Sequence, residues 1–151
     1  MKKPLVISAC LLGVSCRYDG DTKPLDRSVL DRSVLDRLRE RWELVPVCPE
    51  QLGGLETPRP PAERQGDRIV ADTGRDVTAQ YRRGAAQALY LAQLFGADTA
   101  LLKQRSPSCG SGTIYDGSFS GALTAGSGVT AEAFAAAGIT VFGESEVEKL
   151  L

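Results

Sequence analysis

The sequence predicts an α/β fold: a three-layer sandwich whose sheet is mostly parallel and Rossmann-like. Short, nearly unbroken apolar runs recur along the chain, which is typical of strands covered on both faces. Segments with helical spacing lie between these runs, and turns rich in glycine and proline follow them. Because 151 residues suffice to bury one core, we expect a single domain over residues 1–151.

Four apolar runs are predicted to form the sheet, and a fifth run is a smaller strand or hairpin arm. The four runs are residues 4–9, 43–48, 99–103 and 139–142, and the smaller one is residues 67–72. The second run contains Pro46, which has no N–H to donate and therefore suits the end of a strand or the edge of the sheet better than its centre. The proline- and glycine-rich residues 49–66 are expected to be an ordered loop that shapes a site.

Helices are predicted between and after these strands. The most regular is residues 77–95, where apolar or small residues recur at helical spacing, Asp76 caps the start and Gly96 ends it. A second helix ends at Gly138, and a short helix closes the chain. The five-residue repeat in residues 25–38 rotates its apolar pairs around a helix by about 140° per repeat. We therefore expect a solvated helix there, without a function of its own.

The composition excludes several classes of protein. The chain is 42% apolar and 25% charged, with a net charge of -1. These values argue against a disordered tail, a membrane span or a basic face for nucleic acid. The start, MKKPLVISAC, has no small-residue cleavage pattern, so we interpret it as a strand and not as a signal peptide. We expect a cytoplasmic protein whose thiols stay reduced.

The sequence contains no histidine. Ser-His-Asp triads, Cys-His pairs and imidazole metal ligands are therefore excluded. Any proton transfer must use a carboxylate, lysine, tyrosine, cysteine, a hydroxyl group or water.

Cysteines follow three of the predicted strands: Cys10, Cys48 and Cys109. In open parallel α/β sheets, the loops after the carboxyl ends of the strands gather on one edge, and ligands bind there. We therefore expect the three thiols to converge. Each lies in a loop rich in glycine or proline, which lets the backbone approach a compact group closely.

Four cysteines without histidine leave four interpretations: structural zinc, an iron–sulfur cluster, a thiol enzyme, or buried cysteines without a task. Zinc sites take closely spaced ligand pairs such as C-x2-C, and none of the four cysteines is so paired. Thiolates also suit iron–sulfur clusters, and a cluster held by three cysteines leaves one iron open. Cys16 decides between a closed site, if it is a ligand, and a site that binds substrate, if it is not.

Motifs along nearly the whole chain resemble those of one known family. They are SACLLG and CRYDG, then PVCPE with GGL and PRPPAE, then LLK with RSPSCG and IYDG, and finally GVTAEAFAAAGITVF. Together, and in this order, they are similar to the thiouracil desulfurases, a small bacterial family. The repeat in residues 25–38 lies outside this similarity.

The resemblance implies a 4Fe-4S cluster held by Cys10, Cys48 and Cys109, whose fourth iron is free to take substrate sulfur. The implied reaction is non-redox: a small-molecule thiolated pyrimidine such as 2-thiouracil exchanges its thiocarbonyl sulfur for oxygen and gives uracil and sulfide. The family's catalytic pair beside the attacking water falls on Glu50 and Ser106. Taken alone, Glu50 is a solvated loop carboxylate and Ser106 a hydroxyl that caps its own turn.

Two other interpretations stay open. In the first, all four cysteines hold zinc or a closed cluster in a metal-stabilised binding module without catalysis, so that Cys16→Ser would lose the metal. In the second, a metal-free thiol enzyme uses Cys16 or Cys109 as its nucleophile and Glu50 as its base.

Overall fold

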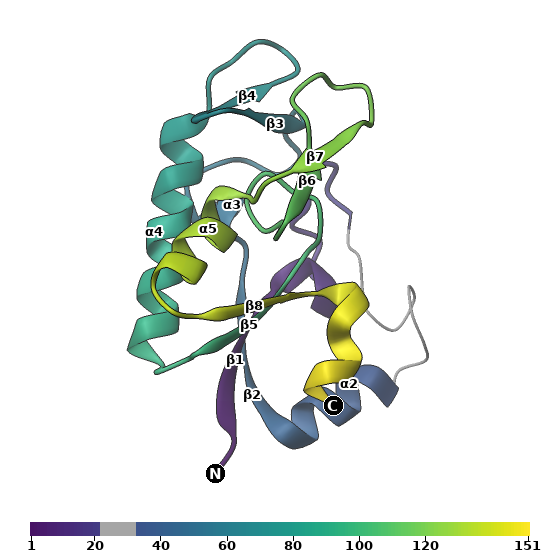
Figure 1. Ribbon diagram of the computed structural model, residues 1–151, viewed down its shortest axis with the longest axis vertical. Coiled ribbons are helices and arrows are strands. Elements are labelled where there is room, and N and C mark those ends of the chain that lie inside the picture. Colours follow the sequence, from purple (N-terminus) through teal and green to yellow (C-terminus); the bar gives the residue numbers. More distant parts are fainter. Residues whose placement is uncertain (22–32) are drawn as a thin grey trace.

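The computed structural model describes residues 1–21 and 33–151, and it has the predicted α/β architecture (Figure 1). The central sheet has four parallel strands in the order β2-β1-β5-β8. These strands are β1 (Lys3–Ser8), β2 (Trp42–Val47), β5 (Thr99–Leu102) and β8 (Thr140–Gly143). The four predicted strands are thus confirmed.

Strand β2 lies at one edge of this sheet. It pairs with β1 along its whole length, from Lys3 opposite Trp42 to Ser8 opposite Val47. Pro46 lies opposite Ile7 and is exposed. The edge position predicted from Pro46 is confirmed. A proline is tolerated at the edge of a sheet because no further strand pairs there and needs its N–H.

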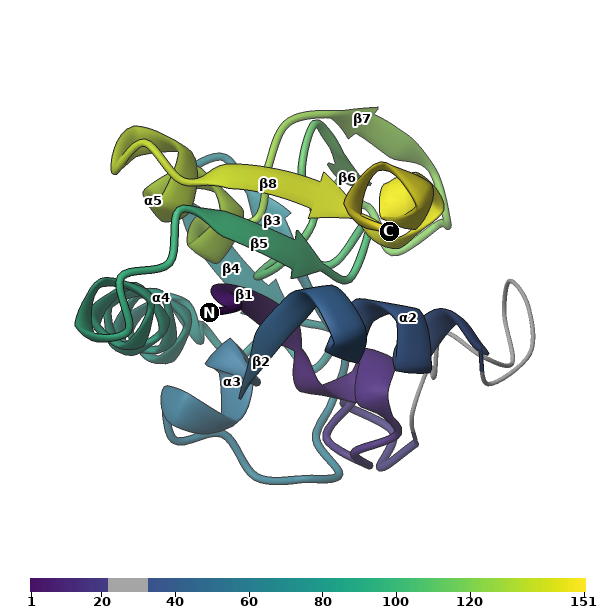
Figure 2. The same cartoon turned by 90° about the horizontal axis from the view of Figure 1, so that it is seen from below.

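Helices cover both faces of the sheet (Figure 2). The covering elements are α4 (Thr78–Leu94) and α5 (Val129–Ala136) on one face, and α2 (Ser33–Arg41) with the closing 3-10 helix η2 (Glu144–Leu150) on the other. On the first face, alanines of α4 and Phe134 of α5 pack against Val6 of β1. On the second, Val147 of η2 packs with Leu5 and Ile7 of β1. The sheet is therefore the middle layer of three.

The ends of α4 agree with the sequence-based expectation. Asp76 accepts a hydrogen bond from the backbone N–H of Thr78 at 2.9 Å. Gly96 follows the last turn with a φ of 70°, a left-handed conformation that favours glycine.

The expectation of a solvated helix over the repeat is wrong for its described part. Helix α2 buries Val34 and Leu38 completely against the sheet. These two residues are four positions apart, so they share one face of the helix, whereas the five-residue spacing used for the prediction spreads apolar pairs around it. Residues 22–32, which include the first repeats, lie outside the described residues.

Two antiparallel hairpins stand beyond the carboxyl end of the sheet (Figure 1). They are β3 (Ala62–Gln65) with β4 (Arg68–Ala71), and β6 (Thr113–Tyr115) with β7 (Leu123–Ala125). The first contains the predicted small strand, but the expected loop of residues 49–66 also holds α3 (Pro49–Leu52) and β3. The hairpin of β6 and β7 was not predicted. Each of its strands has only three residues, and the three residues of β7 are all exposed, so no apolar run marks them.

The described residues include no helix that is long and apolar enough to cross a membrane.

Candidate active site

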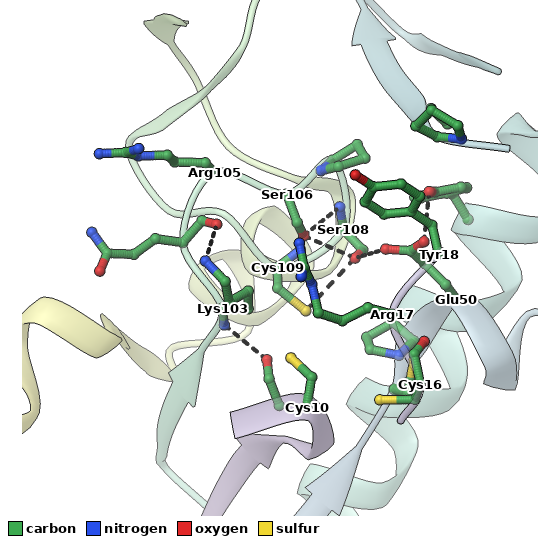
Figure 3. A pocket seen from close by; sticks show the side chains of 18 of the residues that line it. Cys10, Cys16, Arg17, Tyr18, Glu50, Lys103, Arg105, Ser106, Ser108 and Cys109 are labelled. Atoms are coloured by element: carbon green, nitrogen blue, oxygen red, sulfur yellow. Dashed lines mark hydrogen bonds between the residues drawn. The ribbon is translucent and has the colours of Figure 1, made fainter. Parts of the chain in front are cut away.

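A pocket of about 820 Å³ opens at the carboxyl ends of β1, β2 and β5 (Figure 3). All four cysteines line it. Cys10 follows β1 in the one-turn 3-10 helix η1 (Ala9–Leu12), Cys48 stands between β2 and α3, and Cys109 lies in the loop after β5. The structure thus brings together the three thiols whose positions after strands predicted their convergence.

Cys16 belongs to the same wall of the pocket. Its carbonyl oxygen accepts a hydrogen bond from the Cys48 thiol at 3.6 Å, and its own thiol is hydrogen-bonded to Cys10 and Cys48. Cys16 is 2% exposed. Position alone therefore does not separate a site with three cysteine ligands from one with four.

The thiols of Cys16 and Cys109 resist ionisation in their protein surroundings. A hydrogen bond with Cys10 and burial raise the pKa of Cys16 to about 11. Burial raises the pKa of Cys109 to about 12, although a hydrogen bond from Ser8 opposes the shift. A metal-free thiol enzyme needs a thiolate near neutral pH, so these environments do not favour that interpretation.

The donor set fits an iron–sulfur cluster better than a single metal ion. Within the part of the chain that the structure describes, no three Cys, Asp or Glu side chains gather closely enough to hold one ion. A four-iron cluster is wider than one ion, and thiolates are its usual ligands. Cys10, Cys48 and Cys109, from three strand ends around one pocket, suit a group of that size.

Glu50 lies in the one-turn helix α3, and its carboxylate faces the loop of Cys109 (Figure 3). Oε1 accepts hydrogen bonds from the Tyr81 hydroxyl at 2.8 Å and from Arg59 Nε at 3.0 Å. Oε2 accepts one from Ser108 Oγ at 2.8 Å. The side chain is 14% exposed, so Glu50 is a fixed, largely buried carboxylate and not a solvated one.

Two glycines bring α3 against α4 and so place Glu50. A Cβ on Gly84 would lie 1.8 Å from the carbonyl oxygen of Pro49, and one on Gly53 would lie 1.9 Å from that of Gln80. Only residues without a side chain allow this backbone contact. Tyr81, one turn before Gly84 on α4, thereby comes within hydrogen-bond distance of Glu50.

Ser106 has the turn-capping contacts expected from its sequence context. Its Oγ accepts hydrogen bonds from the backbone N–H groups of Cys109 at 2.7 Å and of Ser108 at 3.3 Å. The Oγ atoms of Ser106 and Ser108 are 3.1 Å apart. Ser106 therefore connects to Glu50 through Ser108.

Lys103 lines the same pocket and forms an ion pair with Glu144 at 2.9 Å. Its backbone N–H donates to Ser8 Oγ at 2.8 Å. Tyr115 also lines the pocket.

Comparison with known proteins finds relatives over nearly the whole chain. The family model of 2-thiouracil desulfurase matches residues 5–146. The chain belongs to this family. Among curated relatives, uncharacterized protein YbbK of Bacillus subtilis (strain 168) is 40% identical over 157 residues, which cover 97% of this chain and 99% of that protein. The resemblance of the motifs to the desulfurase family is thus confirmed.

A solved structure of a desulfurase family relative has the same fold. The protein, described as the [4Fe-4S]-dependent thiouracil desulfidase TudS, matches with a TM-score of 0.90 and 47% sequence identity. The match covers 99% of this chain and 95% of the other.

Three site residues of this desulfurase family member escaped the sequence-based prediction: Arg59, Tyr81 and Ser108. Ser108 adjoins Cys109, but serine in a turn is common, and its partner Glu50 lies 58 positions away. Tyr81 falls among the apolar or small residues whose helical spacing predicts the helix at residues 77–95, and nothing in that pattern marks it as a site residue. Arg59 stands in a proline-rich segment that gives no periodic signal.

Proposed function

We propose that this chain is a 4Fe-4S-dependent desulfurase that converts a small thiolated pyrimidine, such as 2-thiouracil, into uracil and sulfide. One observation carries the proposal: three cysteines from three strand ends and a buried, hydrogen-bonded carboxylate line one pocket. The family and the desulfidase relative support the same activity. All of these residues belong to what we propose is a single domain, and a reducing compartment such as the cytoplasm would keep the thiols available.

Cys10, Cys48 and Cys109 are the proposed ligands of the cluster. When bound, the cluster would supply an iron with an open position, which polarises the thiocarbonyl group and stabilises the leaving sulfide. The three thiols must give up their protons to become ligands, so loading of the cluster releases protons. We propose that Cys16 stays outside the ligand set.

Glu50 is the proposed base, and Ser106 is its proposed partner. In the net reaction one water supplies the new carbonyl oxygen, its two protons leave with the sulfur as hydrogen sulfide, and no electron is gained or lost. Glu50 accepts a proton from the attacking water, since the chain has no histidine for this task. Ser106 is placed to pass a proton, because Ser108 connects its hydroxyl to Glu50.

A binding module without catalysis is the alternative that the pocket still allows. Its supporting observation is that Cys16 lines the pocket with the three proposed ligands. That module would need a fourth cysteine ligand, but it gives no role to the carboxylate that Tyr81 and Ser108 hold beside them.

The experiment is to add 2-thiouracil to anaerobically purified, cluster-loaded protein and to follow loss of the thiouracil absorbance, with uracil and sulfide measured as products. We expect turnover by the wild type. Glu50→Gln should keep the cluster and lose about 100-fold or more in kcat, as expected for removal of a general base. A Glu50→Gln variant with wild-type turnover would exclude Glu50 as the base.

A further inference from the structure

Arg59 is the one charged residue among the buried residues of the described chain. Its side chain is 3% exposed and lines the pocket beside α3. A guanidinium group taken out of water is costly unless its N–H groups find acceptors. The acceptors that Arg59 finds indicate what the residue does.

Four hydrogen bonds from the guanidinium group join separate segments of the chain. Nε donates to Oε1 of Glu50 at 3.0 Å. Nη1 donates to the carbonyl oxygen of Glu56 at 3.1 Å and to Oγ1 of Thr57 at 2.9 Å. Nη2 donates to the carbonyl oxygen of Cys16 at 2.8 Å. The planar fork of arginine suits such an array, because its donors point in fixed and different directions.

The two ends of this array both belong to the proposed site. Glu50 is the proposed base, and Cys16 lies in the loop after Cys10 that forms one wall of the pocket. The backbone N–H of Arg59 also donates to the carbonyl oxygen of Tyr18, in the same loop, at 2.7 Å. Arg59 thus ties the carboxylate to the loop that follows the first cysteine.

Each of the other donors to Glu50 comes from a different element. Tyr81 donates from α4, and Ser108 donates from the loop of Cys109. Arg59 donates both to the Glu50 carboxylate and to the Cys16 carbonyl oxygen, which also accepts from the Cys48 thiol at 3.6 Å, so it joins the carboxylate itself to the loop of Cys16.

We propose that Arg59 is a positioning residue, which holds the Glu50 carboxylate in a fixed orientation relative to the cysteine wall of the pocket. This inference rests on the proposed desulfuration. A base that is displaced by about 1 Å can lose about 100-fold in rate. Lysine keeps the positive charge, but its single nitrogen cannot reach acceptors on three segments at once.

The test compares Arg59→Lys with Arg64→Lys in cluster-loaded protein kept under anaerobic conditions. Arg64 is a matched control: it donates to Gly66 and Ser127 carbonyl oxygens and to Glu132, with 12% of its side chain exposed, and it does not line the pocket. The measurements are iron content, the visible spectrum, and kcat and KM with 2-thiouracil. A second measurement combines Arg59→Lys with Glu50→Gln and records thermal unfolding midpoints.

We expect Arg59→Lys to keep its iron and spectrum, to leave KM within about twofold, and to lower kcat about 100-fold, while Arg64→Lys matches the wild type. The shifts in unfolding midpoint of Arg59→Lys and Glu50→Gln should not add in the double variant, because each removes the same contact. The proposal would be overturned by any of three results: equal kcat values for the two lysine variants, additive shifts in the unfolding midpoint, or loss of iron in Arg59→Lys but not in Arg64→Lys. A wild type without turnover would instead overturn the proposed function, whereas active wild type with active Arg59→Lys overturns the role of Arg59 only.

Discussion

Ser108 Oγ donates a hydrogen bond to Oε2 of Glu50 across 2.8 Å, from a residue that adjoins Cys109. The contacts of Ser106 also indicate which of the two serine hydroxyl groups donates to the other. Ser106 Oγ accepts two backbone N–H groups, from Cys109 and Ser108, so both of its lone pairs are used. Its own hydrogen is then available to Ser108 Oγ, 3.1 Å away. Three side chains are therefore ordered as donor, relay and acceptor beside the cysteines.

The first prediction concerns this order. Ser108→Ala removes the donor to Oε2 of Glu50 and separates Ser106 from the carboxylate, so we expect kcat to fall about 10- to 100-fold, as for loss of a hydrogen bond to a charged group. Cluster content should stay at the wild-type level. The exposed Ser111, two positions after Cys109, supplies the control Ser111→Ala. Equal kcat values for the two variants would exclude the relay.

The second prediction concerns the contact between α3 and α4. Gly84→Ala should lower the free energy of unfolding by about 1–3 kcal/mol, as expected for overpacking, because the new Cβ would lie 1.8 Å from the carbonyl oxygen of Pro49. Helix propensity alone predicts the opposite sign, since alanine is about 1 kcal/mol better than glycine inside a helix. Urea unfolding decides between them, with Arg83→Ala at an exposed position of α4 as the control. A Gly84→Ala variant more stable than the wild type would contradict the close contact.

The third prediction concerns stability at alkaline pH. Burial, with the neighbouring charge of Glu50, raises the pKa of Tyr81 well above its usual value of about 10. The folded chain thus keeps the phenol proton where the unfolded chain loses it. The stabilisation is fully present below pH about 10 and is lost as pH rises above it.

Tyr81→Phe tests this sign. It should lower the free energy of unfolding by about 1–3 kcal/mol at pH 8, because Glu50 loses a donor, and the gap to the wild type should narrow by pH 11. Tyr90→Phe, at a tyrosine that is 58% exposed, should follow the wild type at both pH values. A gap that stays constant between pH 8 and pH 11 would exclude proton linkage at Tyr81.

The sheet and the placement of the cysteines could be predicted from the sequence, because both follow from local patterns. Apolar runs such as residues 4–9 mark buried strands, and the residue after such a strand lies at the ligand-binding edge of a parallel sheet. Cys10 and Cys48 were placed in this way. Pro46 likewise marked the edge strand, since its missing N–H is a property of the residue itself.

The partners of Glu50 could not be predicted, because they depend on contacts between distant segments. Ser108 and Tyr81 lie 58 and 31 positions from Glu50, and no local pattern connects such positions. Helix α2 shows a related limit: its burial depends on Val34 and Leu38 sharing one face, whereas the five-residue repeat indicated a helix without a consistent apolar face.

The central claim is that three cysteines, and not four, hold a catalytic iron–sulfur cluster. It is tested most directly by iron and acid-labile sulfide analysis, with a visible spectrum, of anaerobically purified wild type and of four variants in which each cysteine in turn is replaced by serine. We predict about four iron and four sulfide per chain in the wild type and in Cys16→Ser, and loss of the cluster in Cys10→Ser, Cys48→Ser and Cys109→Ser. Zinc in place of iron, or loss of the cluster in Cys16→Ser, would contradict the claim and favour a closed, metal-stabilised module.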